Sequence, residues 1–265
     1  MGDFAALSLL SLALVLALQL LTYAISRRAG RLSVVDVTWG IGLALVALLA
    51  AAVGTGDATR RTLLAVIVVV WGLRLARHIH RRSRGKGEDP RYARLAEGRS
   101  PASIFARVFL TQGLAQWFVS LPVQVSASTG PPRGFGLALV VLGVVVAVAG
   151  MAVEAVADRQ LAAFKADPGN RGAIMDRGLW SWSRHPNYFG DACVWVGVYL
   201  VACAVWPGVL TAPSPAAMTY FLVVATGARL LERHMADRPG FADYQRRTSF
   251  FVPRPPRPAN GQGLT

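Results

Sequence analysis

Cysteine, histidine and acidic residues are scarce in this chain, and their scarcity excludes several kinds of protein. Only 2 of the 265 residues are Cys. They lie about 15 Å apart along one expected helix, so Cys193 and Cys203 cannot form a disulfide with each other. The 4 His residues show no spacing typical of a zinc or iron site, so no metal is expected. No glycine-rich Rossmann or P-loop motif occurs, which excludes those two nucleotide-binding folds.

Hydrophobic and basic residues are abundant instead. Hydrophobic residues make up 54% of the chain, which is too many for an ordinary soluble domain of this length. The net charge of +14 would suit a nucleic-acid partner, but the basic residues are dispersed and no aromatic platform interrupts them. We therefore expect an integral membrane protein without a nucleic-acid partner. Membrane topology and contact with anionic lipids explain most of the basic excess.

Long apolar runs predict an all-α integral membrane protein with about seven transmembrane helices. Each span needs about 20 mainly apolar residues. The fourth segment is the least regular, because Arg107, Gln112 and Gln116 interrupt it. The first lacks the features of a cleaved secretory signal and is interpreted as a retained helix. The seven segments are 4–25, 34–53, 62–80, 104–123, 134–157, 189–206 and 214–231.

The distribution of basic residues predicts the orientation of these spans. Of the 28 Lys and Arg residues, 22 lie at 27–31, 81–99, 159–184 and 229–257, which are alternate connections and the C-terminal segment. The positive-inside rule then places the N-terminus outside and the C-terminus in the cytoplasm. We expect one multi-pass domain over 1–252 with a cofactor region at about 159–252, followed by a disordered tail, 253–265.

Two basic regions on the predicted cytoplasmic side are candidate anion sites. The connection 159–184 combines Lys and Arg with several glycines and ends where an apolar helix begins, a combination suited to phosphate groups. Arg74, Arg77 and Arg81 follow one another at helical spacing. These arginines either extend from the helix end toward the membrane surface or form a cationic surface that faces a polyanionic ligand. The neighbouring polar residues favour the second interpretation: Glu88, Asp89, Arg91 and Tyr92.

The most informative segment reads RGLWSWSRHPNYFGD, at 177–191, and continues into an apolar helix. Together with ERHMADRPGFADYQRRTSFFVP, at 232–253, it resembles the steroid 5-alpha-reductase family, and specifically its bacterial branch of DUF1295-like membrane proteins. The segments DVTWG at 36–40, WGLRLARHIHRR at 71–82, GEDPRY at 87–92 and DPGNRG at 167–172 extend the similarity. This resemblance implies a seven-helix enzyme of the bacterial cytoplasmic membrane that binds NADPH from the cytoplasm and reduces a conjugated carbon–carbon double bond in a lipid-like substrate.

The resemblance also implies a set of cofactor-binding residues. Asn187, Tyr188 and Asp191 match the segment that contacts the cofactor, although reductases commonly have Glu where this chain has Asp191. His185 either has a chemical role or only orders the loop. The full candidate set is Asn170, Arg171, Arg177, Arg184, His185, Asn187, Tyr188, Asp191, Tyr244 and Arg247, together with Arg74 and Arg81.

The catalytic positions match the resemblance less well. In the steroid enzymes a Tyr and a carboxylic acid polarise the substrate carbonyl, and the matching positions here are Trp71 and Asp36, with Val35 at the neighbouring Gln position. Trp can donate a hydrogen bond but cannot give up a proton as a phenol can. Asp36 could instead be structural, paired with Arg74 or at the helix start. Hydride transfer is expected between Asp36 and the 187–191 segment.

Two other functions remain open. Membrane methyltransferases for isoprenylcysteine and phospholipids resemble the same RHPNYFG segment and bind S-adenosylmethionine there. They typically carry a Glu-Glu pair on the last helix, whereas this chain has Glu232 followed by Arg233. A non-enzymatic membrane protein or transporter is the third possibility. The partners expected are a lipid-like small molecule and membrane lipids, and no protein partner can be inferred.

Overall fold

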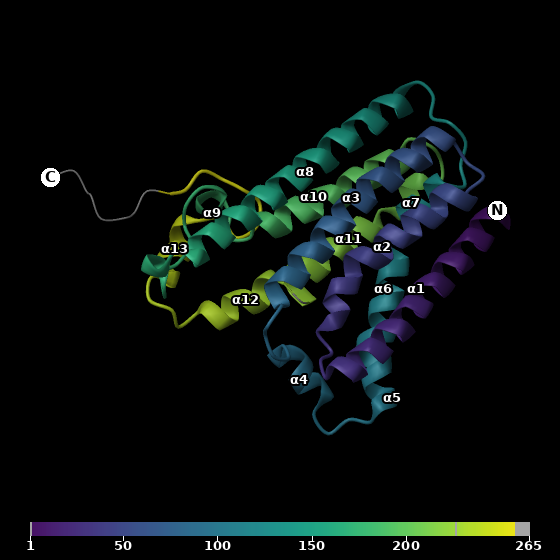
Figure 1. The fold of residues 1–265 in the computed structure, drawn as a ribbon. Coiled ribbons are helices and arrows are strands. Elements are labelled where there is room, and N and C mark those ends of the chain that lie inside the picture. Colours follow the sequence, from purple (N-terminus) through teal and green to yellow (C-terminus); the bar gives the residue numbers. More distant parts are fainter. Residues whose placement is uncertain (1, 226, 258–265) are drawn as a thin grey trace. The chain divides into compact units, whose positions relative to one another are not determined.

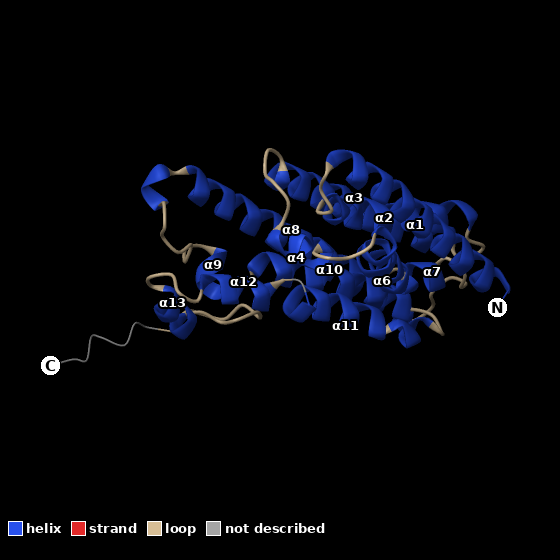
Figure 2. Ribbon diagram, turned by 90° about the horizontal axis from the view of Figure 1, so that it is seen from below, coloured by secondary structure: helices blue, strands red, loops and turns tan. Residues whose placement is uncertain are grey.

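A computed structural model describes residues 2–225 and 227–257 of the chain. Every regular element in this described part is a helix (Figures 1 and 2), and the only β-type contact there is an isolated parallel bridge between Ser183 and Ser249. The chain divides into two compact units. Unit 1 comprises Met1–Val141 and Val198–Ser214, and unit 2 comprises Leu142–Gly197 and Pro215–Thr265.

Five helical segments of the described chain are long and apolar enough to cross a membrane, which agrees with a multi-pass membrane protein. The last of them joins four shorter elements: η3 (Gly208–Thr211), α11 (Pro213–Tyr220), η4 (Phe221–Ala225) and α12 (Ala228–Met235). The five segments are α1 (Gly2–Ala29), α2 (Val34–Val53), α3 (Ala58–Ser83), α8 (Phe135–Ala166) and Gly208–Met235.

Two predicted spans have a different form. The fourth, 104–123, is divided among α5 (Pro101–Ile104), the π-helix η1 (Phe105–Leu110), α6 (Thr111–Val119) and α7 (Leu121–Ser126). A π-helical turn and Pro122 interrupt the regular helical hydrogen bonds there. The sixth is α10 (Pro186–Cys203), whose first turns carry the polar Asn187 and Asp191. Neither is among the five apolar spans, so the count of seven stays a prediction.

In unit 1, α2 and α3 cross with their backbones in contact. A Cβ atom added to Gly40 would lie 2.2 Å from the carbonyl oxygen of Gly72, and one added to Gly72 would lie 2.4 Å from the oxygen of Gly40. Such close approach requires glycine on both helices and is typical of membrane helix packing. Trp71, beside this crossing, is completely buried. The crossing fixes how the start of α2 lies against α3.

Helix α1 has a polar inner face and an apolar outer face. Its buried residues recur every three or four positions and are mainly polar: Leu7, Ser8, Ser11, Val15, Gln19, Thr22 and Ser26. The exposed side carries large aliphatic residues such as Leu9, Leu20 and Ile25. This pattern suits a helix whose outer surface meets lipid and whose polar groups must find partners inside the protein.

In unit 2, α8 and α10 also approach through glycines, because a Cβ on Gly150 would lie 2.5 Å from the oxygen of Gly190. The short helices η2 (Pro168–Asn170), α9 (Leu179–Trp182) and α13 (Phe241–Arg247) complete the unit. The first residues of the predicted tail are tied to it, since the backbone N–H of Arg254 donates to the oxygen of Trp182 at 2.9 Å. Residues 258–265 of that tail lie outside the described residues.

Candidate functional site

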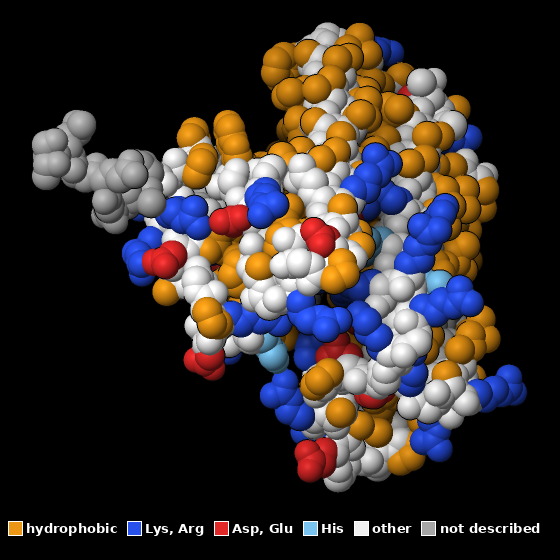
Figure 3. Space-filling view, turned by 60° about the vertical axis from the view of Figure 1, so that its left-hand side comes forward, with side chains coloured by type: hydrophobic (Ala, Val, Ile, Leu, Met, Phe, Trp, Pro, Cys, Tyr) orange, Lys and Arg blue, Asp and Glu red, His pale blue; other side chains and the backbone are white. Residues whose placement is uncertain are grey.

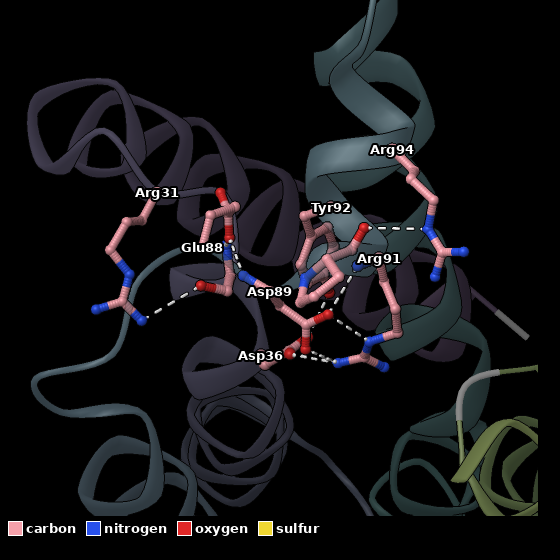
Figure 4. A network of polar contacts seen from close by, with 9 residues as sticks. Arg31, Asp36, Glu88, Asp89, Arg91, Tyr92 and Arg94 are labelled. Carbon is pink, nitrogen blue, oxygen red and sulfur yellow. Dashed lines mark hydrogen bonds and ion pairs between the residues drawn. The ribbon is translucent and has the colours of Figure 1, made fainter. Parts of the chain in front are cut away.

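Asp36 lies in the first turn of α2, in unit 1, and accepts hydrogen bonds from two donors (Figure 4). The hydroxyl of Tyr92 donates to Oδ1, and Nη2 of Arg91 lies 3.3 Å from Oδ2. A helix N-terminus favours negative charge, which suits a carboxylate at this position. The Asp36 side chain is 25% exposed. A phenol and a carboxyl group thus lie in direct contact.

The loop that carries these donors is held at the start of α2 by acidic side chains. The Glu88 carboxylate accepts the backbone N–H of Leu32 and, at 3.0 Å, that of Ser33. Asp89 accepts the backbone N–H of Arg91 at 2.8 Å and so caps α4 (Pro90–Ala96). These bonds satisfy N–H groups at the beginnings of two helices. The loop is therefore anchored, and Tyr92 is fixed in position.

The Tyr92 ring packs in an apolar cluster, while its hydroxyl points to Asp36. Val35, Val108 and Phe109 are the other buried members of this cluster, and Tyr23 packs against it. Burial and the negative charge of Asp36 raise the pKa of the Tyr92 hydroxyl. Tyr92 therefore stays a protonated hydrogen-bond donor at neutral pH.

Nearby charges also shift the pKa values of Asp89 and Arg91, which lie close to Tyr92 in the chain. Burial alone would raise the pKa of Asp89, but its hydrogen bonds with Arg91 and the positive charge of that residue outweigh burial and lower it. Burial would lower the pKa of Arg91, and its contacts with Asp89 and Asp36 raise it instead. Both residues remain ionised at neutral pH, which keeps the anchor of the loop intact.

Sequence reasoning placed the donor at Trp71 and considered Tyr92 only as a neighbour of the candidate anion site, not as a proton donor. Trp71 is buried beside the α2–α3 crossing. Tyr92 and Asp36 are 56 positions apart, and their contact depends on the folding of the 84–92 loop. A local signal was available, because Asp89 before Pro90 is a typical helix start and places Tyr92 in the first turn of a short helix.

The two other unit 1 candidates differ in exposure: Arg74 is half-buried, and Arg81 is exposed. Six of the seven basic residues between 81 and 99 are exposed, and Figure 3 shows Lys and Arg side chains outnumbering acidic ones on the face in view. Among these seven basic residues, Arg91 is the one that is half-buried. The basic residues at the end of α3 are therefore available to an anionic group.

Arg184 is the centre of a polar network in unit 2, but its donors are largely used within the protein. Nε lies 2.5 Å from Glu232 Oε1, and Nη2 lies 3.3 Å from Oε2. Nη1 donates to the backbone oxygens of Gln245 at 3.1 Å and Thr248 at 2.6 Å. A guanidinium has five N–H donors, so few remain for a ligand. Arg184 holds the end of α13 in place.

His185 shares the same carboxylate. Its Nε2 lies 3.2 Å from Glu232 Oε1, and its ring stacks on Tyr188 with centroids 5.9 Å apart. Phe250 packs against the edge of the imidazole at 5.4 Å. His185 is buried, and its contacts hold the loop before α10. Sequence reasoning missed Glu232 as a partner because it lies 47 positions away.

Three buried carboxyl groups lie on the helices α8 and α10 in unit 2. Glu154, Asp158 and Asp191 are all buried, and Asn187 Nδ2 donates to Asp158 Oδ1 at 3.3 Å. Among the described residues, no group of three or more His, Cys, Asp or Glu residues is arranged to hold a metal ion. Asn187 thus connects α10 to α8 through Asp158, and Asp191 is a second buried polar residue of α10.

The remaining unit 2 candidates have separate roles. Arg171 and Arg177 are exposed. Asn170 closes the η2 turn, since its Nδ2 donates to the oxygen of Phe164 at 3.1 Å. Arg247 Nη2 lies 3.1 Å from Asp176 Oδ2. Of these four, Arg171 and Arg177 are the most available to an incoming phosphate.

Tyr244 is a structural anchor of unit 2. Its hydroxyl donates to the backbone oxygen of Trp180 at 2.6 Å, and the Trp180 indole in turn donates to the oxygen of Ala157 at 3.0 Å. Burial raises the pKa of the Tyr244 hydroxyl, so the donor stays protonated. These bonds connect α13, α9 and α8.

Comparison with known protein families gives a match over most of the chain. The model of a family described as a protein of unknown function, DUF1295, matches residues 22–248. The chain belongs to the DUF1295 family. The matched region of this DUF1295 protein includes both the Asp36–Tyr92 pair and the Arg184–Glu232 network. Searches of curated proteins and of solved structures each find no match.

Proposed function

We propose that this DUF1295 protein is a membrane-embedded, NADPH-dependent reductase of a conjugated carbon–carbon double bond in a lipid-like carbonyl compound. The observation that carries the proposal is the contact between the Tyr92 hydroxyl and Asp36. Reduction of an enone needs an acidic group at the carbonyl oxygen, where negative charge develops. Methyl transfer from S-adenosylmethionine needs no such pair.

The pair would act as a proton relay. With a proton on Asp36, its O–H donates to the Tyr92 oxygen, and the phenol proton is then free to point at the substrate carbonyl. NADPH, when bound, supplies a hydride to the β-carbon of the double bond. The proton passes from Asp36 through Tyr92 to the carbonyl oxygen, and the resulting enol converts to the saturated ketone. Arg91 and the anchored loop keep both groups in position.

The cofactor would be held by unit 2. Arg171 and Arg177 are exposed and would bind the phosphate groups, for which the guanidinium fork is well suited. Asn187, Tyr188 and Asp191 would contact the rest of the cofactor. Arg184 acts as a positioning residue, because Glu232 and two backbone oxygens occupy most of its donors. Seven spans, with the C-terminus in the cytoplasm, complete the proposal.

Binding of NADPH, NADH and S-adenosylmethionine to the detergent-purified protein tests the cofactor. We expect saturable NADPH binding, weaker NADH binding, and a loss of about tenfold or more in the Arg171→Ala/Arg177→Ala double variant. Arg133→Ala removes an exposed arginine from unit 1 and serves as the matched control. Binding of S-adenosylmethionine without NADPH would make the protein a methyltransferase instead.

Turnover tests the acid pair, with NADPH oxidation measured against a panel of unsaturated lipid ketones. Tyr92→Phe and Asp36→Asn should lower turnover by about a hundredfold while NADPH binding stays unchanged. Tyr23→Phe is the matched control, since its ring packs against the same apolar cluster but its hydroxyl donates to the backbone oxygen of Pro101 at 3.4 Å. Full activity in Tyr92→Phe would remove this residue from the chemistry.

A further inference from the structure

Two buried glutamines form an amide pair inside unit 1. Gln19 on α1 and Gln116 on α6 are completely buried, and Gln19 Nε2 donates to Gln116 Oε1 at 2.8 Å. The three helices α1, α2 and α6 lie side by side around the pair (Figure 1). Polar side chains are costly in an apolar environment and usually have a partner or a function there.

The direction of every bond in the pair follows from its neighbours. Gln116 Nε2 lies 2.9 Å from the backbone oxygen of Thr38 and 3.0 Å from that of Trp39, and these oxygens can only accept. The NH₂ group of Gln116 must therefore face α2, and its oxygen must face Gln19. Gln19 must in turn present its own NH₂ group. The free end of the pair is consequently the Gln19 carbonyl oxygen.

That oxygen is buried and has no hydrogen-bond partner among the described residues. The helices make room for the pair, because a Cβ on Gly42 would lie 2.4 Å from Gln116 Nε2 and one on Gly113 would lie 3.1 Å from Gln19 Cγ. A buried acceptor without a donor is destabilising. The close packing of Gly42 and Gly113 and the fixed direction of the amides therefore leave the Gln19 carbonyl oxygen as an acceptor without a donor among the described residues.

A third buried glutamine of unit 1 also has an unpartnered carbonyl oxygen within the described chain. Gln124 Nε2 donates to the oxygen of Trp117 at 3.1 Å and to Ser120 Oγ at 2.8 Å, while its own oxygen is buried without a partner in the described chain. Ser11, on the buried face of α1, also has an unpartnered hydroxyl. All three open groups can accept an O–H donor.

We propose that Gln19 and Gln116 form a subsite inside unit 1 that accepts a hydrogen bond from a hydroxyl group. The hydroxyl comes either from a lipid alcohol held in the bundle or from an internal water molecule, since both offer the same O–H donor. The subsite does not depend on the proposed reductase activity. It assigns a ligand class to Gln19 and to Gln116, and the sequence indicated Gln116 only as an interruption of the fourth span.

The test uses the full chain in lipid nanodiscs. Native mass spectrometry with lipid extraction detects a bound lipid alcohol, and radiolytic hydroxyl labelling detects internal water beside Gln19. We expect one of these signals in the wild type and a loss of about five- to tenfold in Gln19→Met, which removes the acceptor at similar length. Thr22→Val is the matched control: Thr22 is on the same buried face, but its hydroxyl already donates to the oxygen of Leu18 at 2.7 Å.

The outcomes separate the two sources of the hydroxyl. A lipid alcohol that is lost in Gln19→Met and kept in Thr22→Val identifies a lipid subsite, and labelling without a retained lipid identifies a water site. The proposal fails if the wild type shows neither signal, or if Gln19→Met keeps the signal at full strength. Labelling of the wild type needs no variant, so the test stands even if Gln19→Met does not fold.

Discussion

The two units hold their polar segments with opposite charges. In unit 1, the carboxylates of Glu88 and Asp89 accept backbone N–H groups at the beginnings of α2 and α4. In unit 2, the Arg184 guanidinium donates to backbone oxygens at the end of α13. The helix dipole explains both choices, because helix starts favour negative charge and helix ends favour positive charge. The acidic residues of unit 1 thus lie at helix starts, and the basic Arg184 of unit 2 lies at a helix end.

The two networks also differ in what they leave available. In unit 2, Glu232 and two backbone oxygens take up most of the Arg184 donors, so the network is mainly structural. In unit 1, Glu88 and Asp89 bind the backbone N–H groups that anchor the loop, whereas the contact between the Tyr92 hydroxyl and Asp36, which Arg91 also contacts, involves none of these N–H groups. Because Glu88 and Asp89 hold the loop, Tyr92 and Asp36 can exchange a proton with a substrate without loosening it.

Removal of Arg184 should have the largest effect, because it breaks the anchor of unit 2. Arg184→Ala leaves Glu232 without its guanidinium partner, and the two side chains are only 11% and 16% exposed. We expect the free energy of unfolding to fall by about 2–4 kcal/mol, measured by chemical denaturation in detergent. Limited proteolysis should show earlier cleavage after α13.

The control for Arg184 is the exposed pair of Arg246 and Asp243 on the same helix, α13. Arg246→Ala removes an arginine of the same segment without breaking a buried contact, and exposed ion pairs contribute little. Its stability and cleavage pattern should match the wild type. If Arg184→Ala behaved as Arg246→Ala does, the structural role of Arg184 would be wrong.

Removal of Glu88 should have a smaller effect, confined to unit 1. Glu88→Ala leaves the backbone N–H groups of Leu32 and Ser33 without their acceptor, at a cost of about 1–2 kcal/mol. Hydrogen exchange should become faster at these two amides, while the amides of α13 should exchange as before. Glu97→Ala removes an exposed carboxylate from the same segment and is the matched control. Equal exchange in both variants would contradict the anchor.

Sequence reasoning predicted the features that depend on local composition. Five of the seven expected spans are long apolar helices, because apolar length is a property of one segment. The segment 104–123 was harder to predict, since η1 and Pro122 divide it and its polar Gln116 bonds to another helix. The polar inner face of α1 was also difficult to predict. Its few serine and glutamine residues at helical spacing are outnumbered by leucine in the same segment.

Partners that are distant in sequence could not be predicted. The sequence singles out Asp36 as a candidate catalytic carboxylate, but its contact with Tyr92 joins residues on different helices. Arg184 was expected to bind a phosphate group, and the structure adds the Glu232 partner that occupies it. Residue type indicates what a side chain can bind, whereas the fold decides which of its donors remain free.

The smallest expected effect is the pH dependence of the unit 1 anchor. The contacts with Arg91 lower the pKa of Asp89 in the folded protein, so its contribution to stability is present above its ordinary value of about 3.9 and is lost as the pH falls through the lower folded value. Asp89→Asn keeps a good helix cap and removes only the charge. The stability gap between wild type and Asp89→Asn should therefore narrow on acidification below about pH 4. In an Arg91→Ala background the gap should be smaller already at neutral pH, and an unchanged gap there would mean that Arg91 is not the source of the shift.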